Sequence, residues 1–338
     1  MSESDRRRET TIEEKLASCV RAWYPGATGV VAAEKLSGGA SQETWRFDIV
    51  HPEGNVGAIL RRAPRGYGAA PSRAAGLNAE ARLMQLAFDA GVPSPRVLHV
   101  LTPEDDLGTG FIMQRVDGET IARKILREEK FSDARPKLAW QLGIVLAGIH
   151  SLPHTHLPEL RRMTAAKELD EFERDYRSLK WPKPVFELAL RWLRDHDPGP
   201  PAEVTLVHGD FRNGNLIIGP DGVRAVLDWE LAHLGDPMED LGWVCVNSWR
   251  FGEIDKPVGG FGRREELFAG YEAAGRRVDA ARVMFWEVMG TLRWGLMCGG
   301  MMQRFRLGPD HSMERAMIGR RASETEIDLM RLLVPRGR

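Results

Sequence analysis

Residues 205–230 read TLVHGDFRNGNLIIGPDGVRAVLDWE. Two apolar runs in this stretch flank a Gly-Pro-Asp-Gly turn at 219–222, a pattern that predicts a β-hairpin. With the middle two turn residues at the tip, Asn215 lies opposite Val226 and diagonal to Asp228. Because strand side chains alternate between the two faces of a sheet, we expect Asn215 and Asp228 to share one face at the open end of the hairpin.

The polar residues of this stretch have the types and spacing that phosphoryl transfer requires. Asn215 and Asp228 offer oxygen ligands of the kind that Mg²⁺ prefers. Asp210 lies in the loop that enters the hairpin, where a carboxylate can orient an acceptor hydroxyl and take its proton. A lone His-Gly-Asp is typical of an ordinary loop, but the spacing from Asp210 to Asn215, followed by Asp228, matches a kinase catalytic loop and its metal-binding aspartate. We expect His208 to brace this loop.

The N-terminal third has the pattern of a small antiparallel sheet. A capping-box pattern predicts a first helix over 11–24. Three β-rich runs between 29 and 62 predict an antiparallel meander, followed by a helix that ends at Gly91 and by two further strands. Beyond this sheet the chain is mostly helical, with an amphipathic tract at 165–194, and only the hairpin region interrupts the helices.

The length, charge balance and cysteine content of the chain limit the classes of protein to which it can belong. A chain of 338 residues exceeds the usual size of one hydrophobic core, so two lobes or domains are expected. The 47 basic residues nearly balance the 48 acidic ones, which argues against electrostatic binding to nucleic acid or membrane. No apolar run approaches the roughly 18 residues of a membrane helix. Three scattered cysteines are typical of reduced thiols, and we expect a cytoplasmic protein.

The runs at 206–218, LVHGDFRNGNLII, and at 226–243, VLDWELAHLGDPMEDLGW, resemble the aminoglycoside phosphotransferase and choline kinase family. More narrowly, they are similar to the phosphotransferase-like domain that precedes an acyl-CoA dehydrogenase in some fusion proteins. The resemblance extends from about Leu36 to the final helix. It implies an α+β, protein-kinase-like fold with two lobes. The smaller, at 1–115, would bind nucleotide, and the larger, mostly helical lobe at 116–338 would hold the catalytic loop, the metal site and the acceptor pocket.

The resemblance also implies roles for individual residues. Asp210 corresponds to the catalytic base and Asn215 and Asp228 to the Mg²⁺ ligands, with ATP or GTP as the phosphoryl donor. Asp240, in the segment after the metal site, is implied to brace the catalytic loop. Glu230 follows Asp228 by two residues on the predicted strand. It is either an outer metal ligand or substrate contact, or a solvated carboxylate at the strand end.

A phosphate clamp is expected on the third strand, where kinases use lysine. This chain has Arg61 and Arg62 there, and Arg61 fits the lysine position better, although the sequence leaves both open. Glu80 lies on the inward stripe of the following helix, between Leu77 and Met84, and a buried charge there requires a partner. We predict an ion pair between Glu80 and Arg61, with a glutamate that reaches water as the alternative.

Two further segments are candidates for nucleotide contacts. The loop between the first two strands contains Ser37, Gly38, Gly39 and Ser41. The family has a glycine-containing loop over the phosphates at this place, although an ordinary hairpin loop has the same composition. Residues 111–116 are expected to form the interlobe hinge, with the backbone of Gln114 and Val116 facing a purine. A plain buried strand is the alternative.

The acceptor is expected to bind in the helical lobe. Arg293 is a candidate contact there for a carboxylate or CoA-like group. A cationic aminoglycoside is less favoured as the acceptor, because the sequence has no concentrated acidic run near its C-terminus. We therefore expect a kinase acting on a hydroxy acid or hydroxyacyl thioester. A nucleotide-binding pseudokinase, suggested by the arginine in the lysine position, is the alternative. The sequence has no DFG or APE motif after Asp228, which disfavours a protein kinase, and no P-loop or dinucleotide-binding motif.

Overall fold

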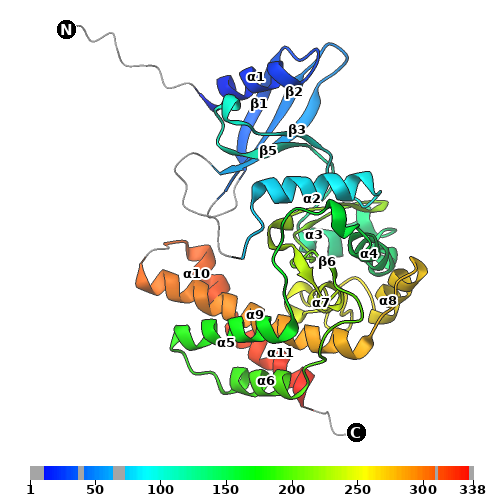
Figure 1. The fold of residues 1–338 in the computed structure, drawn as a ribbon, viewed down its shortest axis with the longest axis vertical. Helices are drawn as coiled ribbons and strands as arrows, with labels where there is room; N and C mark the ends of the chain where they lie inside the picture. The colour runs from blue at the N-terminus through cyan, green and yellow to red at the C-terminus, as the bar shows by residue number, and fades with distance from the viewer. Residues whose placement is uncertain (1–10, 37–41, 64–72, 309–310, 335–338) are drawn as a thin grey trace, which may run out of the picture.

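The computed structural model describes residues 11–36, 42–63, 73–308 and 311–334. Its N-terminal part is a sheet with two helices, and the remainder is mostly helical (Figure 1). The sheet part consists of α1 (Ile12–Trp23), β1 (Gly29–Leu36), β2 (Glu43–Val50), β3 (Val56–Ala63), α2 (Leu77–Asp89), β4 (Val97–Val100) and β5 (Thr109–Gln114). This confirms the predicted α+β class and the predicted order of strands and helix.

The five strands form one antiparallel sheet in the order β1-β2-β3-β5-β4. The helix α1 begins with the predicted capping box and packs on one face of the sheet against Ala58 and Leu60. The helix α2 packs with Ile59 on the other face. Because side chains alternate along β3, Arg61 lies on the α2 face and Arg62 on the α1 face.

The C-terminal part is built around long helices. Its helices are α3 (Ala122–Arg127), α4 (Arg135–His150), α5 (Ala165–Leu179), α6 (Pro184–Asp195), α7 (Met238–Trp243), α8 (Arg264–Ala273), α9 (Ala280–Leu307), α10 (Met313–Gly319) and α11 (Ala322–Leu333). Its short strands are β6 (Thr205–Val207), β7 (Leu216–Gly219), β8 (Gly222–Val226) and β9 (His233–Gly235). Figure 1 shows α5, α6, α9 and α11 layered at the end of the molecule away from the sheet.

The amphipathic tract at 165–194 is two helices, α5 and α6. Lys180 takes a left-handed conformation after α5. The next helix, α6, starts at Pro184, because a helix tolerates proline only in its first turn. A second feature that the sequence did not indicate is β9, which pairs antiparallel with β6. The loop that carries Asp210 therefore leaves a two-stranded sheet and enters the β7–β8 hairpin.

The hairpin forms as predicted, but its register differs from the prediction. Gly219 pairs with Gly222 as expected, whereas Arg224 is left without a partner residue on β7 and forms a β-bulge. The extra residue on β8 places Leu216, and not Asn215, opposite Val226. The predicted pairing of Asn215 with Val226 is therefore wrong, because a period-two count of the strand cannot anticipate a bulge.

Candidate active site

The loop before Asp210 is held by one buried carboxylate. Asp240, in α7, accepts hydrogen bonds from the backbone N–H of His208 at 2.8 Å and of Gly209 at 2.9 Å. His150 Nε2 lies 3.0 Å from the same carboxylate. Burial alone would raise the pKa of Asp240, but these hydrogen-bonding partners hold it below its usual range. Asp240 thus makes the contacts expected of a brace for the loop.

His208 links this loop to the hairpin. Its Nδ1 accepts a hydrogen bond from the N–H of Asp210 at 3.2 Å, and its Nε2 lies 3.1 Å from the carbonyl oxygen of Leu227. This pair of partners requires the neutral ring with the proton on Nε2. Burial lowers the pKa of His208, which favours the same neutral form. The geometry fits a positioning role for His208.

The Asp210 carboxylate is fixed by three donors. Its Oδ1 accepts hydrogen bonds from Trp243 Nε1 at 2.9 Å and Arg212 Nε at 3.0 Å. Its Oδ2 accepts from Asn215 Nδ2 at 2.7 Å. The guanidinium of Arg212 in turn lies over the ring of Trp249, 4.6 Å from its centroid. The carboxylate is therefore oriented before any acceptor binds.

Asn215 and Asp228 present oxygen atoms to one cavity. Asn215 Nδ2 also donates to the Asp210 carbonyl oxygen at 2.9 Å, so its amide oxygen is the atom that can face a cation. Asp228 lies beyond β8, with φ 66° and ψ 62°, at the start of a 3-10 turn over Trp229–Leu231. The prediction that Asp228 and Glu230 lie on a strand is therefore wrong. The left-handed residue turns the Asp228 side chain toward the cavity that Asn215 also lines.

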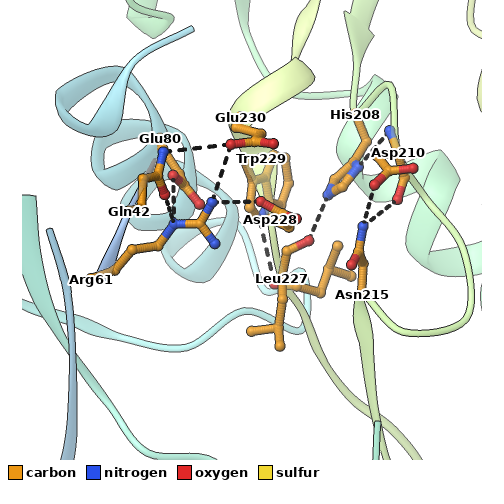
Figure 2. A network of polar contacts seen from close by, with 11 residues as sticks. Gln42, Arg61, Glu80, His208, Asp210, Asn215, Leu227, Asp228, Trp229 and Glu230 are labelled. Carbon is orange, nitrogen blue, oxygen red and sulfur yellow. Dashed lines mark hydrogen bonds and ion pairs between the residues drawn. The ribbon is translucent and has the colours of Figure 1, made fainter. Parts of the chain in front are cut away.

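Arg61 lies among three carboxylates (Figure 2). Its Nη2 donates to Asp228 Oδ1 at 2.6 Å and lies 3.5 Å from Glu230 Oε2. Its Nε lies 3.2 Å from Glu80 Oε2, which confirms the predicted ion pair. The hydrogen of Nε points to Gln42 Oε1, 2.7 Å away, so the contact with Glu80 is an ion pair without a hydrogen bond.

These charges shift one another's ionisation. Burial raises the pKa of Glu80 to about 7, Arg61 opposes the shift, and Asp228 and Glu230 add to it. Burial also raises the pKa of Glu230, and the charge of Asp228 adds to that shift. Three carboxylates against one guanidinium leave an excess of negative charge. Together with the hard oxygens of Asn215 and Asp228, this charge suits a divalent cation such as Mg²⁺.

Arg62 does not reach this cluster. It contacts Glu43 Oε2 at 2.8 Å and the Leu107 carbonyl oxygen at 3.0 Å on the α1 side of the sheet. Of the two arginines left open by the sequence, Arg61 is therefore the one that faces the cavity. The predicted phosphate-loop residues Ser37, Gly38, Gly39 and Ser41 lie outside the residues that the structure describes.

The cavity around Arg61, called the Arg61 cavity below, has a volume of about 620 Å³. Its walls come from both parts of the molecule and include Ile59, Arg61, Glu80, Met113, Gln114, Val116, Asn215, Asp228 and Glu230. The N–H of Gln114 already donates to the Arg96 carbonyl oxygen at 2.8 Å. A purine could therefore use only the carbonyl oxygen of Gln114 together with the backbone of Val116.

A second hollow, the α5–α9 groove, has a volume of about 540 Å³. Arg293 lines it with 12% of its side chain exposed, stacks over the Trp243 ring at 4.5 Å and lies 3.6 Å from Glu239 Oε1. Trp243 is also the residue that donates to Asp210, so the side chains of Arg293 and Trp243 link the groove to the loop that carries Asp210. Its other charged and apolar lining residues include Arg73, Arg161, Glu168, Phe172, His233, Leu296, Met301 and Arg304.

Sequence reasoning missed several contacts of this site. Gln42, Arg212 and Trp243 touch Arg61 or Asp210 directly, and His150 supports Asp240. Trp243 follows Asp240 by three residues on the same helix, a spacing that could have placed it near the loop. The contact between Gln42 and Arg61 joins the residue before β2 to β3, and no local pattern indicates it.

Among the described residues, no helix has the length and apolar character of a membrane span.

The sequence is similar to members of the acyl-CoA dehydrogenase family. Acyl-CoA dehydrogenase family member 10 of Mus musculus is 30% identical to this chain over 227 residues, which are 65% of this chain and 21% of that protein. The chain spans 21–39% of the length of the curated relatives it matches.

Two solved structures share the fold. A choline/ethanolamine kinase family protein from Mesorhizobium loti has a TM-score of 0.65 and 22% identity, with 96% of this chain and 94% of that chain covered. A spectinomycin phosphotransferase in complex with ADP and spectinomycin has a TM-score of 0.64 and 14% identity, with 96% and 100% covered. Residues 32–277 match the APH phosphotransferase enzyme family. The chain therefore belongs to that family.

Proposed function

We propose that this protein transfers the γ-phosphoryl group of ATP or GTP to a hydroxyl group of a small molecule. Residues 1–115 and the hairpin hold the nucleotide, and residues 116–338 carry the catalytic loop and the acceptor site. The observation that supports this most is that Asn215 links Asp210 to the cavity that Asp228 and Arg61 line. Asn215 bonds to Asp210 and lines the same cavity as Asp228 and Arg61.

Each residue has a distinct task in this proposal. Asn215 and Asp228 would hold Mg²⁺, which would neutralise charge on the transferred phosphoryl group. Arg61 leaves Asp228 and pairs with phosphate oxygens, for which its planar guanidinium is suited. Asp210 accepts the proton of the acceptor hydroxyl, while Trp243 keeps its carboxylate in place. The ADP in the solved spectinomycin phosphotransferase supports a nucleotide donor.

The acceptor that we favour is a hydroxy acid or hydroxyacyl thioester, and we consider an aminoglycoside less suited. The α5–α9 groove combines apolar side chains such as Phe172, Leu296 and Met301 with four arginines, of which Arg73 and Arg161 pair with acidic side chains of the same groove. Arginines suit an anionic group and the apolar side chains suit an acyl chain. The similarity to members of the acyl-CoA dehydrogenase family supports the same class of acceptor.

The test is a screen of acceptors with Mg²⁺ and ATP or GTP, read as acceptor-dependent release of nucleoside diphosphate. Hydroxy acids, their CoA thioesters and aminoglycosides form the panel. Asp210→Asn is expected to lower turnover by roughly 10²–10⁴-fold while nucleotide affinity is kept, because a positioned general base contributes about that much. Asp221→Asn, at the exposed hairpin turn, is the matched control and should act like the wild type.

The outcomes separate the candidate functions. Turnover with an aminoglycoside alone contradicts the proposed acceptor class but not the phosphotransferase. Nucleotide binding with no turnover on any hydroxyl compound supports a nucleotide-binding pseudokinase, the second candidate, which the arginine at position 61 favours. Equal turnover of Asp210→Asn and the wild type contradicts the assignment of the base.

A further inference from the structure

A buried cluster of ligand-type side chains lies apart from the Arg61 cavity. It consists of Glu168 in the first turn of α5, His233 in β9 and Glu239 in α7. Each offers one ligand atom, and these atoms all lie within 4.8 Å of one another. All three residues are buried, and Glu168 and His233 line the α5–α9 groove. The nucleotide chemistry proposed above uses none of them.

The His233 ring directs one nitrogen at a backbone carbonyl and the other at Glu239. Its Nδ1 lies 3.0 Å from the Leu231 carbonyl oxygen, a partner that can only accept, so this nitrogen carries a proton. Its Nε2 then points to Glu239 Oε2, 3.1 Å away. In the neutral ring this nitrogen is an acceptor facing another acceptor. The contact therefore requires a second proton on the ring, a proton on Glu239, or a cation bound to both atoms.

Two carboxylate oxygens in the cluster lack hydrogen bonds. Glu168 Oε2 and Glu239 Oε1 are buried and have no hydrogen-bond partner among the described residues. The side chain of Arg293 is 3.6 Å from Glu239 Oε1, beyond hydrogen-bonding distance, and is stacked on Trp243. A buried carboxylate oxygen without a donor is costly, so these two oxygens point to a missing positive partner.

The ionisation of the cluster agrees with this geometry. Burial raises the pKa of Glu168, the charge of Glu239 adds to the shift, and Arg293, His233 and Arg73 oppose it. Burial alone would lower the pKa of His233, but Glu239 and Glu168 together raise it. The two carboxylates of the cluster thus outnumber its one imidazole.

We propose that Glu168, His233 and Glu239 form a second divalent-cation site, which takes a transition metal such as Zn²⁺ or Co²⁺ rather than Mg²⁺. An imidazole nitrogen with two carboxylates suits these ions, whereas Mg²⁺ prefers oxygen ligands alone. Three protein ligands leave a position of a four-coordinate ion for water or for a ligand in the groove, the arrangement of catalytic rather than structural sites.

The experiment measures Zn²⁺ binding by equilibrium dialysis to the full chain, stripped with chelator and free of nucleotide. The wild type is expected to bind one Zn²⁺ per chain in excess of Mg²⁺. Glu168→Gln keeps the size of the side chain and is expected to weaken Zn²⁺ binding at least tenfold, because a neutral amide replaces a charged ligand. Glu171→Gln is the matched control on the same helix. Its carboxylate pairs with Arg73 and Arg161, and its substitution should leave Zn²⁺ binding unchanged.

Two further measurements keep the outcome unambiguous. Asp228→Asn should retain the Zn²⁺ site, which shows that the ion is not at the nucleotide site. The visible spectrum of wild-type chain with Co²⁺ should show the intense bands of a four-coordinate ion with a nitrogen ligand, and this needs no variant. No Zn²⁺ binding, equal binding by Glu168→Gln and Glu171→Gln, or loss in Asp228→Asn would overturn the proposal. An absence of Zn²⁺ binding would indicate instead that Glu168, His233 and Glu239 form an internal ion-pair cluster with a doubly protonated His233.

Discussion

At the scale of single residues, the site depends on how Arg61 is shared. Its guanidinium contacts Asp228 and Glu80 in this structure, and in the proposed function the same donors pair with phosphate oxygens of the nucleotide. In this structure Arg61 supplies positive charge to the carboxylates of the cavity. Side chains alternate between the two faces of the sheet along β3, so Arg61 faces the cavity and Arg62 lies on the opposite face.

Replacing Arg61 should weaken nucleotide binding. Arg61→Ala is expected to lower the affinity for ATP by about 10- to 100-fold, since hydrogen bonds to charged groups contribute roughly 1.5–3 kcal/mol. Arg62→Ala, on the opposite face, is the matched control and should change the affinity little. Isothermal titration calorimetry with a non-hydrolysable ATP analogue measures both. Equal affinities for Arg61→Ala and the wild type contradict the clamp.

Glu80 should make stability depend on pH. Its pKa is raised from 4.5 to about 7, so between these values the folded chain keeps a proton that the unfolded chain loses. Stability therefore falls as pH rises through this window, by roughly 1–3 kcal/mol from this group. Glu80→Gln removes the contribution, and its stability relative to wild type should rise from pH 5 to pH 8.

Urea unfolding at pH 5, 6, 7 and 8 checks this effect. Glu34→Gln, at an exposed position of β1 paired with Arg46, is the control and should follow the wild-type profile. Unfolding free energies that change with pH in the same way for Glu80→Gln and the wild type would contradict the raised pKa of Glu80. They would show that Glu80 is ionised across this range in the folded chain.

At the scale of elements, the catalytic loop needs glycine at position 209. Gly209 has a φ of +79°, and a Cβ there would lie 2.5 Å from the Leu231 carbonyl oxygen. Gly209→Ala is expected to lower the free energy of unfolding by about 1–3 kcal/mol and to reduce turnover, because the loop backbone must move. Gly199 has a similar φ of +67°, but a Cβ added there would have no atom within 4 Å. Gly199→Ala therefore measures the stability cost of the positive φ without a steric clash.

Thermal unfolding and turnover of both glycine variants decide the point. A stability loss in Gly209→Ala well above that of Gly199→Ala, together with loss of turnover, is expected. Similar behaviour of the two variants contradicts the close contact between the loop and Leu231.

The elements also show what the sequence can predict. The strands at 29–36 and 43–50 and the inward position of Glu80 follow from local periodicity, and the structure confirms them. The bulge at Arg224, the pairing of β6 with β9 and the left-handed Asp228 do not follow from it. A bulge changes register without changing composition, and the other two depend on segments that meet only in the folded chain.

At the scale of the whole molecule, the Arg61 cavity joins two parts that are distant in sequence. Arg61 on the sheet and Asp228 beyond the hairpin are separated by 167 positions and lie 2.6 Å apart at their contacting atoms. The segment before α2 adds a backbone contact, since the N–H of Ala75 donates to the Glu230 carbonyl oxygen at 2.7 Å. The nucleotide proposed for this cavity would contact both parts at once.

The central claim is that Asn215 and Asp228 hold the catalytic metal ion while Asp210 does not. Electron paramagnetic resonance of Mn²⁺, titrated in the presence of a non-hydrolysable ATP analogue, tests it most directly. Asn215→Ala and Asp228→Asn should each weaken nucleotide-dependent Mn²⁺ binding by about tenfold or more, whereas Asp210→Asn should keep it and lose turnover. Undiminished Mn²⁺ binding in both ligand variants would contradict the account.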